Sequence, residues 1–268
     1  MANVKIGVAF HPQHTTAAEF LRGWQAADEL GVDSLWTWDH FFPLTGDPDG
    51  ASFEAWTLLA AAGVQTRRAE IGCLVHGMSY RNPALLSAMA KTLDHFLGGR
   101  LILGLGAGWF ERDYDEYGYE FGTAGERLRN LERGIEVIKE RWAIDEPKPP
   151  RGTIPILIGG GGEKVTLRIT AQHADLWHGF GTPEEWGHKN RILDEWCAKV
   201  GRDPSTIKRS VTIGDERWDE PMVEIGPHEE RLEQYIAAGA DLFTYGSASP
   251  FDLAPIRALV AWRDGRRG

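Results

Sequence analysis

The sequence predicts an α/β protein folded as a (β/α)8 TIM barrel, in which eight parallel strands close into a ring surrounded by helices. Two observations lead to this class: short apolar runs alternate with longer amphipathic stretches, and the alternation repeats eight times without a break in composition. The chain has 268 residues and is 42% hydrophobic, which is enough for one large core, so we expect residues 1–268 to form a single domain. A doubly wound open sheet is the alternative, and eight regular units would make such a sheet unusually long.

Each predicted strand is a short apolar run of the kind that is buried on both faces of a sheet. In chain order these runs are 5–10, 34–38, 70–73, 101–105, 154–158, 175–177, 208–213 and 241–245. The fourth run is too short and too interrupted by glycine to form a stable helix.

The segments between these strands carry apolar residues at helical spacing. We expect helices over 15–30, 54–62, 83–96, 125–142, 163–173, 184–200, 229–238 and 253–262. Gly31, Gly201 and Gly239 mark the ends of three of them. The proline-rich segment 146–151 is interpreted as a loop, because a strand and a helix of the same kind follow it directly.

The ends of the strands are where function is expected, because in this fold the loops after the strands face one common mouth. Glycines and aromatic residues follow the fourth and fifth strands, and histidines stand at several other strand ends. The four histidines are His11, His40, His76 and His178. Such a mouth suits a large flat ring with an anionic tail better than a small hydrophilic metabolite.

Four consecutive glycines, residues 159–162, lie between the fifth strand and a helix expected to begin near Glu163. Free backbone N–H groups at a helix start attract an anion, and glycine lets a phosphate come close, so we favour phosphate binding over a plain turn. Lys164 and Arg168 would add positive charge if they faced this turn, but a solvated helix face is the commoner role of such a pair.

The histidines also raise a metal-dependent hydrolase on the same barrel as an alternative. Their spacing disfavours it, because His11 and His14 cannot place both side chains on one strand face, and few carboxylates accompany the histidines. We therefore expect no metal site.

Charge and cysteine content restrict the partners and the compartment. A net charge of −10 argues against nucleic acid, and no apolar run is long enough to span a membrane. The two cysteines are too few for a disulfide framework, and no signal peptide is evident. We expect a cytoplasmic protein that acts on a small molecule.

Five segments together resemble the bacterial luciferase-like superfamily. They are 34–43, 80–83, 93–101, 103–109 and 158–162, and they span most of the chain. Their order and spacing most resemble the actinobacterial branch that uses the deazaflavin coenzyme F-420 instead of FMN. The family fold is a (β/α)8 barrel, in agreement with the count of strands and helices.

The resemblance implies which residues meet the cofactor. Asp39 and His40, after the second strand, correspond to residues beside the ring. In the family, the end of the third strand often carries a bulge behind the ring that contains a non-prolyl cis peptide. The corresponding residues are Cys73, Leu74 and Val75, and the cis bond is expected between Cys73 and Leu74. The turn that borders the ring corresponds to Gly106, Ala107 and Gly108, and the phosphate contacts correspond to Gly160, Gly161 and Gly162, with Glu163 beside them.

The resemblance also implies the chemistry, which is hydride transfer between the deazaflavin and an organic substrate. His40 is the candidate acid or base, since its ordinary pKa lies near neutrality, and Asp39 is expected to orient it or to bind the ring edge. The alternative is an FMN-dependent monooxygenase, which would need a separate reductase. The family is commonly dimeric, so we expect a homodimer.

One departure from the family limits the substrate. Its sugar-phosphate dehydrogenases carry a glutamate directly after the fourth-strand glycine turn and another in the first loop, where this chain has Trp109 and the Pro12-Gln13 region. A glucose-6-phosphate-type substrate is therefore not expected. Aromatic residues near the strand ends instead predict a planar or apolar substrate, and the candidates are Phe10, Trp38, Trp109 and Trp177.

Overall fold

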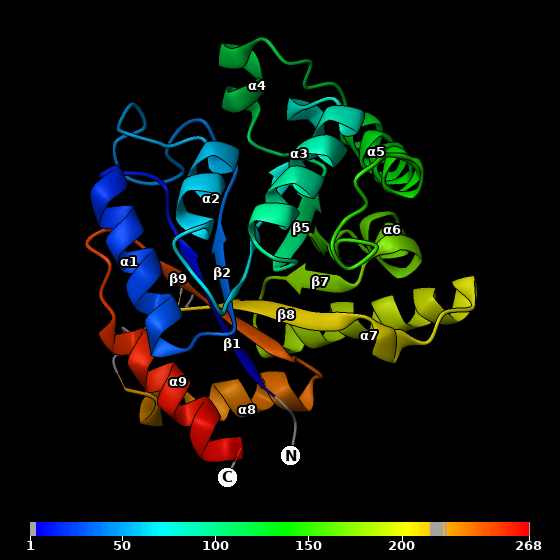
Figure 1. Cartoon of the computed structure of the whole chain (residues 1–268). Coiled ribbons are helices and arrows are strands. Elements are labelled where there is room, and N and C mark those ends of the chain that lie inside the picture. Colours follow the sequence, from blue (N-terminus) through cyan, green and yellow to red (C-terminus); the bar gives the residue numbers. More distant parts are fainter. Residues whose placement is uncertain (1–3, 215–221, 223, 268) are drawn as a thin grey trace.

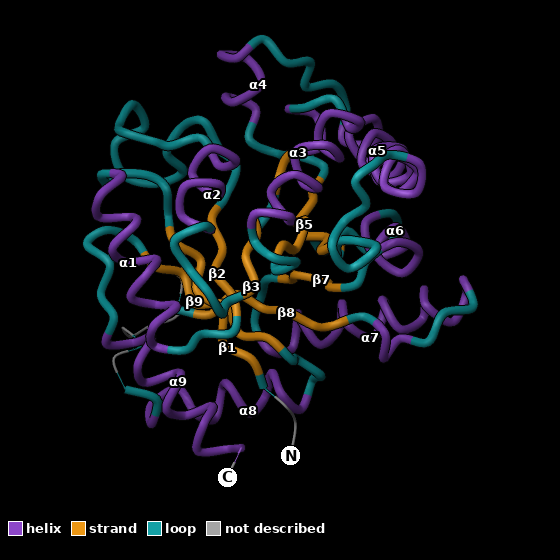
Figure 2. The backbone as a smooth tube through the Cα atoms, in the orientation of Figure 1, coloured by secondary structure: helices purple, strands orange, loops and turns teal. Residues whose placement is uncertain are grey.

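The computed structural model describes residues 4–214, 222 and 224–267, and within them it confirms the (β/α)8 barrel. Strands gather at the centre and helices surround them (Figure 1, Figure 2). The strands are β1 (Lys5–Phe10), β2 (Ser34–Thr37), β3 (Glu70–Cys73), β4 (His76–Gly77), β5 (Leu101–Gly106), β6 (Ile156–Gly159), β7 (Leu176–Gly179), β8 (Lys208–Ile213) and β9 (Leu242–Ser247).

The sheet closes because its two ends pair with each other. Its order is β3-β2-β1-β9-β8-β7-β6-β5-β4, and β3 also pairs with β5 through Ile71 and Leu101. All the strand pairings are parallel, which requires a crossover between each strand and the next. The short strand β4 continues the path of β3 after a break and pairs with β5, so β3 and β4 together fill one of the eight positions of the barrel.

Helices cover the outside of this ring (Figure 1). They are α1 (Ala17–Leu30), α2 (Ala55–Gly63), α3 (Pro83–Phe96), α4 (Glu111–Tyr117), α5 (Ala124–Ile144), α6 (Thr166–His173), α7 (Pro183–Val200), α8 (Glu229–Ala237) and α9 (Ala254–Arg267). Short 3-10 helices occupy Met78–Tyr80, Pro204–Thr206 and Gly226–His228. None of the helices described is long and apolar enough to cross a membrane.

Local sequence explains where several helices begin and end. α1, α5 and α7 each begin with a capping box, in which a threonine and the glutamate three residues later satisfy backbone N–H groups. α1 and α7 end at Gly31 and Gly201, whose φ angles of 87° and 73° are left-handed and favour glycine. The eight predicted helices are all present at the expected positions in the chain, and most of their boundaries differ from the prediction by a few residues.

The structure differs from the prediction at three places. No element is predicted over the segment of α4, yet residues 111–117 form a helix that ends at Gly118 with φ 72°. The helix expected from Glu163 begins only at Thr166, and the third strand is divided into β3 and β4. Each of these differences lies at the mouth of the barrel, where tertiary contacts outweigh local pattern.

The interior of the barrel is filled by apolar side chains from several strands. One cluster joins residues of β2, β5, β6, β7 and β9, namely Trp36, Ile102, Leu157, Leu176 and Leu242. Because residues from so many strands touch, they face the barrel axis and close the barrel below the mouth. Larger apolar clusters lie between the strands and the helices, so the space inside the barrel opens only where the strands finish.

Candidate active site

A cavity of about 270 Å³ lies at the end of the barrel where the strands finish. Its walls come from the segments after β2, β3, β5, β6 and β7, together with β4 and the start of α6. The lining residues are Asp39, His40, Leu74, Val75, Gly77, Tyr80, Gly106, Ala107, Gly108, Trp109, Gly159, Gly160, Thr166, His178 and Phe180. The position is the one at which barrels of this type carry their active sites.

Many of the predicted cofactor and substrate residues meet in this cavity. Those that line it are Asp39, His40, Leu74, Val75, Gly106, Ala107, Gly108, Trp109 and Gly160. Gly161, Gly162 and Glu163 continue the turn beyond Gly160 without lining the cavity. Predicted residues from four separate segments therefore lie together in the folded chain. Their roles in binding a cofactor or a substrate stay predictions.

Several other candidates do not reach the cavity. Phe10 and Cys73 are fully buried in the apolar layer outside the barrel, where Phe10 contacts Phe20 and Trp24. Phe10 faces the helices because residues alternate along β1, so the expectation that it contacts substrate is corrected. Cys73 likewise does not line the cavity, and the predicted cofactor contact stays a prediction.

Two of the predicted tryptophans, Trp38 and Trp177, do not line the cavity. Trp177 is fully buried and stacks on Trp186, with 5.1 Å between ring centroids, and its indole N–H donates to the carbonyl oxygen of Gly160. It therefore supports the glycine turn from behind and does not line the cavity. Trp38 is half-buried and lies 4.1 Å from the ring of His11, and burial lowers the pKa of that histidine to about 4. His11 is therefore neutral at pH 7.

The bulge after β3 has a non-prolyl cis peptide bond, but one residue later than predicted. The bond joins Leu74 to Val75, not Cys73 to Leu74. Cys73 still pairs with Thr37 in the parallel ladder, and the N–H of Leu74 donates to the carbonyl oxygen of Thr37 at 2.7 Å. The backbone consequently leaves the ladder only after Leu74.

The glycines of β5 and β6 leave room for this bulge. A Cβ atom on Gly104 would lie 1.9 Å from the carbonyl oxygen of Cys73. On Gly106 and Gly159 it would lie 2.6 and 2.8 Å from the methyl groups of Val75. Val75 thus fills the space that these glycines leave, and it forms an apolar wall of the cavity together with Leu74.

Asp39 is held by a buried network, and this network does not include His40. Arg81 donates to both carboxylate oxygens, with N–O distances of 2.5 and 3.0 Å, and the Nδ1 atom of His76 donates at 3.2 Å. Arg81 also donates to Glu54 at 2.6 Å, and Trp56 stacks on His76 with 4.4 Å between ring centroids. The expectation that Asp39 orients His40 is therefore wrong.

Electrostatics fixes the charges in this network. Burial alone would raise the pKa of Asp39, but the hydrogen bonds and charges of His76 and Arg81 outweigh it and lower the pKa to about 2. Burial lowers the pKa of His76, against the effect of Asp39. Asp39 is thus a carboxylate paired with Arg81, and His76 is neutral.

The partner of His40 is Asp113, a residue of α4 that the sequence analysis did not consider. The Nδ1 atom of His40 lies 2.7 Å from Oδ2 of Asp113, whose side chain is fully buried. Asp113 also accepts hydrogen bonds from the hydroxyl of Tyr80 and from the backbone N–H groups of Phe41 and Phe42. No local signal marks this pairing, since 73 residues separate its two members.

Exposed aromatic rings flank the cavity. Trp109 is 63% exposed and meets the ring of His40 edge to face at 5.6 Å. Phe180, which was not predicted, is 44% exposed and meets His178 edge to face at 4.9 Å. The cavity thus has an aromatic residue on the β5 loop and another after β7.

A lysine of α7 lies against the glycine turn. A Cβ atom on Gly161 would lie 2.8 Å from Nζ of Lys189, so this lysine crosses the turn closely. Arg168 is bound to Glu132 instead, with N–O distances of 2.6 and 2.9 Å. The N–H of Gly160 donates to the carbonyl oxygen of His178, so it is not free as the sequence analysis expected.

Among the residues that the structure describes, no group of three or more His, Cys, Asp or Glu side chains could hold a metal ion. The histidines at the strand ends take other partners. His76 binds Asp39, and His178 has Ser210 and Thr212 within 2.9 Å of its two ring nitrogens. Within the described part of the chain, these histidines therefore do not form the set of ligands that a metal-dependent hydrolase would need.

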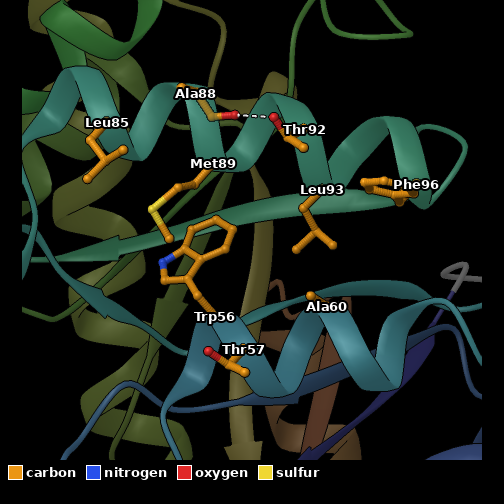
Figure 3. Close-up of a pocket in the computed structure, with 9 residues that line it drawn as sticks. All are labelled: Trp56, Thr57, Ala60, Leu85, Ala88, Met89, Thr92, Leu93 and Phe96. Atoms are coloured by element: carbon orange, nitrogen blue, oxygen red, sulfur yellow. Dashed lines mark hydrogen bonds between the residues drawn. The ribbon is translucent and has the colours of Figure 1, made fainter.

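A second cavity, of about 480 Å³, lies on the outside of the molecule between α2 and α3. Trp56 and Ala60 of α2 face Met89 and Leu93 of α3 across this groove (Figure 3). The residues that line it are apolar or carry a hydroxyl, and none is titratable. It therefore lacks the groups that acid–base chemistry needs.

The fold and the cavity together define a (β/α)8 barrel with a ligand-sized cavity at the carboxyl ends of its strands. Residues 2–214 match the family model described as luciferase-like monooxygenase, and the chain belongs to that family. It is similar to an F-420-dependent glucose-6-phosphate dehydrogenase of Amycolatopsis mediterranei, with 30% identity over 52% of this chain and 46% of that protein. It is also similar to a putative coenzyme F-420-dependent oxidoreductase of Mycobacterium tuberculosis, with 29% identity over 66% of this chain and 55% of that protein. The chain thus spans about half the length of these relatives.

Solved structures of the same fold include an F-420-dependent secondary alcohol dehydrogenase in complex with an F-420-acetone adduct. Its TM-score is 0.83 at 18% identity, and the match covers 96% of this chain and 97% of that one. The FMN-bound oxygenating constituent of 3,6-diketocamphane monooxygenase from Pseudomonas putida is less similar, with a TM-score of 0.63 at 18% identity over 79% and 67% of the two chains. At these identities the likeness confirms the fold.

Proposed function

We propose that this protein is an oxidoreductase that transfers a hydride between coenzyme F-420 and a planar or apolar organic substrate. The observation that carries the proposal is that His40 and the apolar bulge of Leu74 and Val75 line the same cavity at the barrel mouth. Membership of the luciferase-like family and the F-420-dependent relatives support the choice of cofactor. When bound, the deazaflavin supplies the hydride chemistry.

The residues present fit a flat ring with an anionic tail. Leu74, Val75 and Ala107 form an apolar wall, and the glycines beside them let a ring approach the backbone. A cavity of about 270 Å³ is near the lower limit for small-molecule sites, so it suits the ring part of the cofactor. Gly161 follows Gly160 of the lining and Lys189 lies close to it, so these two residues would hold the anionic tail.

The lining of the cavity supports the proposed substrate class. Among the lining residues there is no lysine or arginine, which a phosphorylated sugar would need as counter-charge. Trp109 and Phe180 offer two large apolar faces instead. A planar or apolar substrate that packs against Trp109 would lie next to His40, whose ring Trp109 contacts.

The test is a titration of the purified protein with coenzyme F-420 and, separately, with FMN, followed by fluorescence. We expect F-420 to bind more tightly. Lys189→Ala should weaken F-420 binding by about tenfold, the effect of one lost charge-assisted contact, whereas the matched control Lys164→Ala, on the exposed side of the same turn, should not. Far tighter binding of FMN would overturn the proposal in favour of a monooxygenase with a separate reductase.

We also propose that the chain forms a homodimer through the groove between α2 and α3. Leu85 and Phe96 at this groove are 55% and 71% exposed, and the groove lining is almost wholly apolar, as is typical of a surface that another protein covers. The test is light scattering in solution. Phe96→Glu should give a monomer, and Ile144→Glu, on an exposed side chain of α5, should leave the dimer intact. A monomeric unmodified protein would exclude this proposal.

A further inference from the structure

We propose that Asp113 is a positioning residue that fixes the tautomer of His40, so that Nδ1 carries the proton and Nε2 presents a lone pair to the cavity. The catalytic meaning of this arrangement rests on the proposed function. The tautomer itself is a property of the protein alone and can be measured without cofactor.

The contacts of Asp113 divide between its two oxygens. Oδ1 accepts from the backbone N–H groups of Phe41 and Phe42, at 3.0 and 3.3 Å. Oδ2 lies 2.7 Å from Nδ1 of His40 and accepts from the hydroxyl of Tyr80 at 2.9 Å. All four partners converge on one fully buried carboxyl group, so α4 is linked at this point to the loop after β2 and to Tyr80.

Three of these partners act as donors for independent reasons. A backbone N–H group can only donate. Burial and the charge of Asp113 raise the pKa of Tyr80 far above its ordinary value, so Tyr80 keeps its proton and donates it to Oδ2. An ionised carboxylate only accepts, and His40 must therefore place its own proton on Nδ1 to complete the set.

This arrangement leaves Nε2 of His40 as the ring nitrogen available to a substrate. His40 lines the cavity, and the rings of Trp109 and Phe110 pack edge to face against it at 5.6 and 5.5 Å. The imidazole is thus held by a hydrogen bond on one edge and by aromatic rings around it, a geometry that pre-orients a proton acceptor.

The role in the reaction follows from proton balance. When a hydride leaves the carbon of a substrate alcohol for the cofactor, the C–H bond breaks, a C=O bond forms, and the hydroxyl proton must go to a base. Nε2 of His40 would take that proton, and Asp113 would keep the imidazole in place through the hydrogen bond at Nδ1. In the reverse direction the imidazolium returns the proton to the carbonyl oxygen.

Among the residues that the structure describes, Asp113 contacts His40 directly and Tyr80 contacts Asp113. Two other titratable residues line the same cavity: Asp39, which is neutralised by Arg81, and His178, which is bound to Ser210 and Thr212. Asp113 is therefore the group that decides the tautomer.

The substitution Asp113→Asn tests this because its amide can be oriented in one way only. Position Oδ1 must remain an oxygen, since two backbone N–H groups donate to it. The NH₂ group then occupies the position of Oδ2 and donates to Nδ1 of His40, which forces the proton to Nε2.

The measurement is nitrogen-15 NMR of the imidazole groups in the ligand-free protein, at a pH where His40 is neutral. The chain has nine histidines, so His40→Gln assigns the signal. We expect a protonated Nδ1 and an unprotonated Nε2 in the unmodified protein, and the opposite pattern in Asp113→Asn. Tyr80→Phe is the matched control, because it removes a donor to the same oxygen but leaves the bond to His40, and its tautomer should be unchanged.

A proton on Nε2 in the unmodified protein would refute the inference, and that result needs no variant to fold. An unchanged tautomer in a folded Asp113→Asn would refute it as well. Failure of F-420 to bind would count against the proposed function only, since the tautomer is read without cofactor. In Asp113→Asn the affinity for F-420 should stay within about threefold of the unmodified protein, because Asp113 orients His40 and does not bind the cofactor.

Discussion

Replacing Arg81 with methionine should destabilise the protein strongly at neutral pH, because it leaves the Asp39 carboxylate buried without its cation. Asp39 is 2% exposed, and its pKa is lowered from 3.8 to about 2. That difference corresponds to roughly 2.5 kcal/mol of folding stability above pH 4, which the unmodified protein loses as the pH falls from about 4 to 2. Breaking a buried ion pair from one side costs more, about 3–5 kcal/mol, and we expect Arg81→Met to lie in this range.

The pH dependence of the variant should be weaker than that of the unmodified protein. Without Arg81, only His76 remains to oppose burial, so the pKa of Asp39 should lie above the value of about 2 that it has in the unmodified protein. The unmodified protein loses stability as the pH falls through this range and the variant loses less, so the deficit of Arg81→Met should shrink between about pH 5 and about pH 3. The assay is urea unfolding followed by circular dichroism at both pH values.

Two controls separate this effect from other losses at Arg81. Glu54→Gln removes the second partner of Arg81, a carboxylate that is 38% exposed, and should cost about 1 kcal/mol or less. The double variant Asp39→Asn with Arg81→Met removes both buried charges and should be more stable than Arg81→Met alone. The reasoning fails if Arg81→Met costs no more than Glu54→Gln, or if its deficit is the same at both pH values.

Three further predictions concern the mouth of the barrel. Trp109→Ala should leave the melting temperature within a few degrees of the original, since the ring is 63% exposed, but should raise the KM for an aromatic substrate; an unchanged KM would exclude a substrate contact. Gly104→Ala should destabilise the protein by about 1–3 kcal/mol or more in urea unfolding, because its Cβ atom would lie 1.9 Å from a backbone oxygen, whereas Gly226→Ala meets nothing and should be neutral. The last prediction concerns His11, whose pKa burial lowers to about 4, so that the unfolded chain takes up a proton before the folded protein does. This difference makes the unmodified protein lose roughly 3 kcal/mol of stability as the pH falls from 6.5 to 4, and His11→Phe should abolish that loss. An unaltered pH dependence of unfolding would contradict this.

Repeating patterns were enough to predict the fold. Each strand and most helices are coded by a stretch of a few to twenty residues, and eight repetitions leave one closed architecture as the simplest solution. The glycine turns after β5 and β6 were likewise visible as local sequence, and they do border the cavity. Their main role was not visible, because Gly104, Gly106 and Gly159 accommodate a backbone oxygen and Val75, which come from a different strand.

The pairing of the polar residues was decided by the tertiary structure alone. Asp39 and His40 are neighbours in sequence, yet the chain turns so that they face different partners: Asp39 binds Arg81 and His40 binds Asp113. Local periodicity reports which face of an element is apolar, and it carries no information about which side chains from distant elements meet. The sequence by itself determined a barrel with its ligand site at the carboxyl ends of the strands, and the tertiary structure decided which carboxylate holds the histidine, because that depends on how α4 folds back over the mouth.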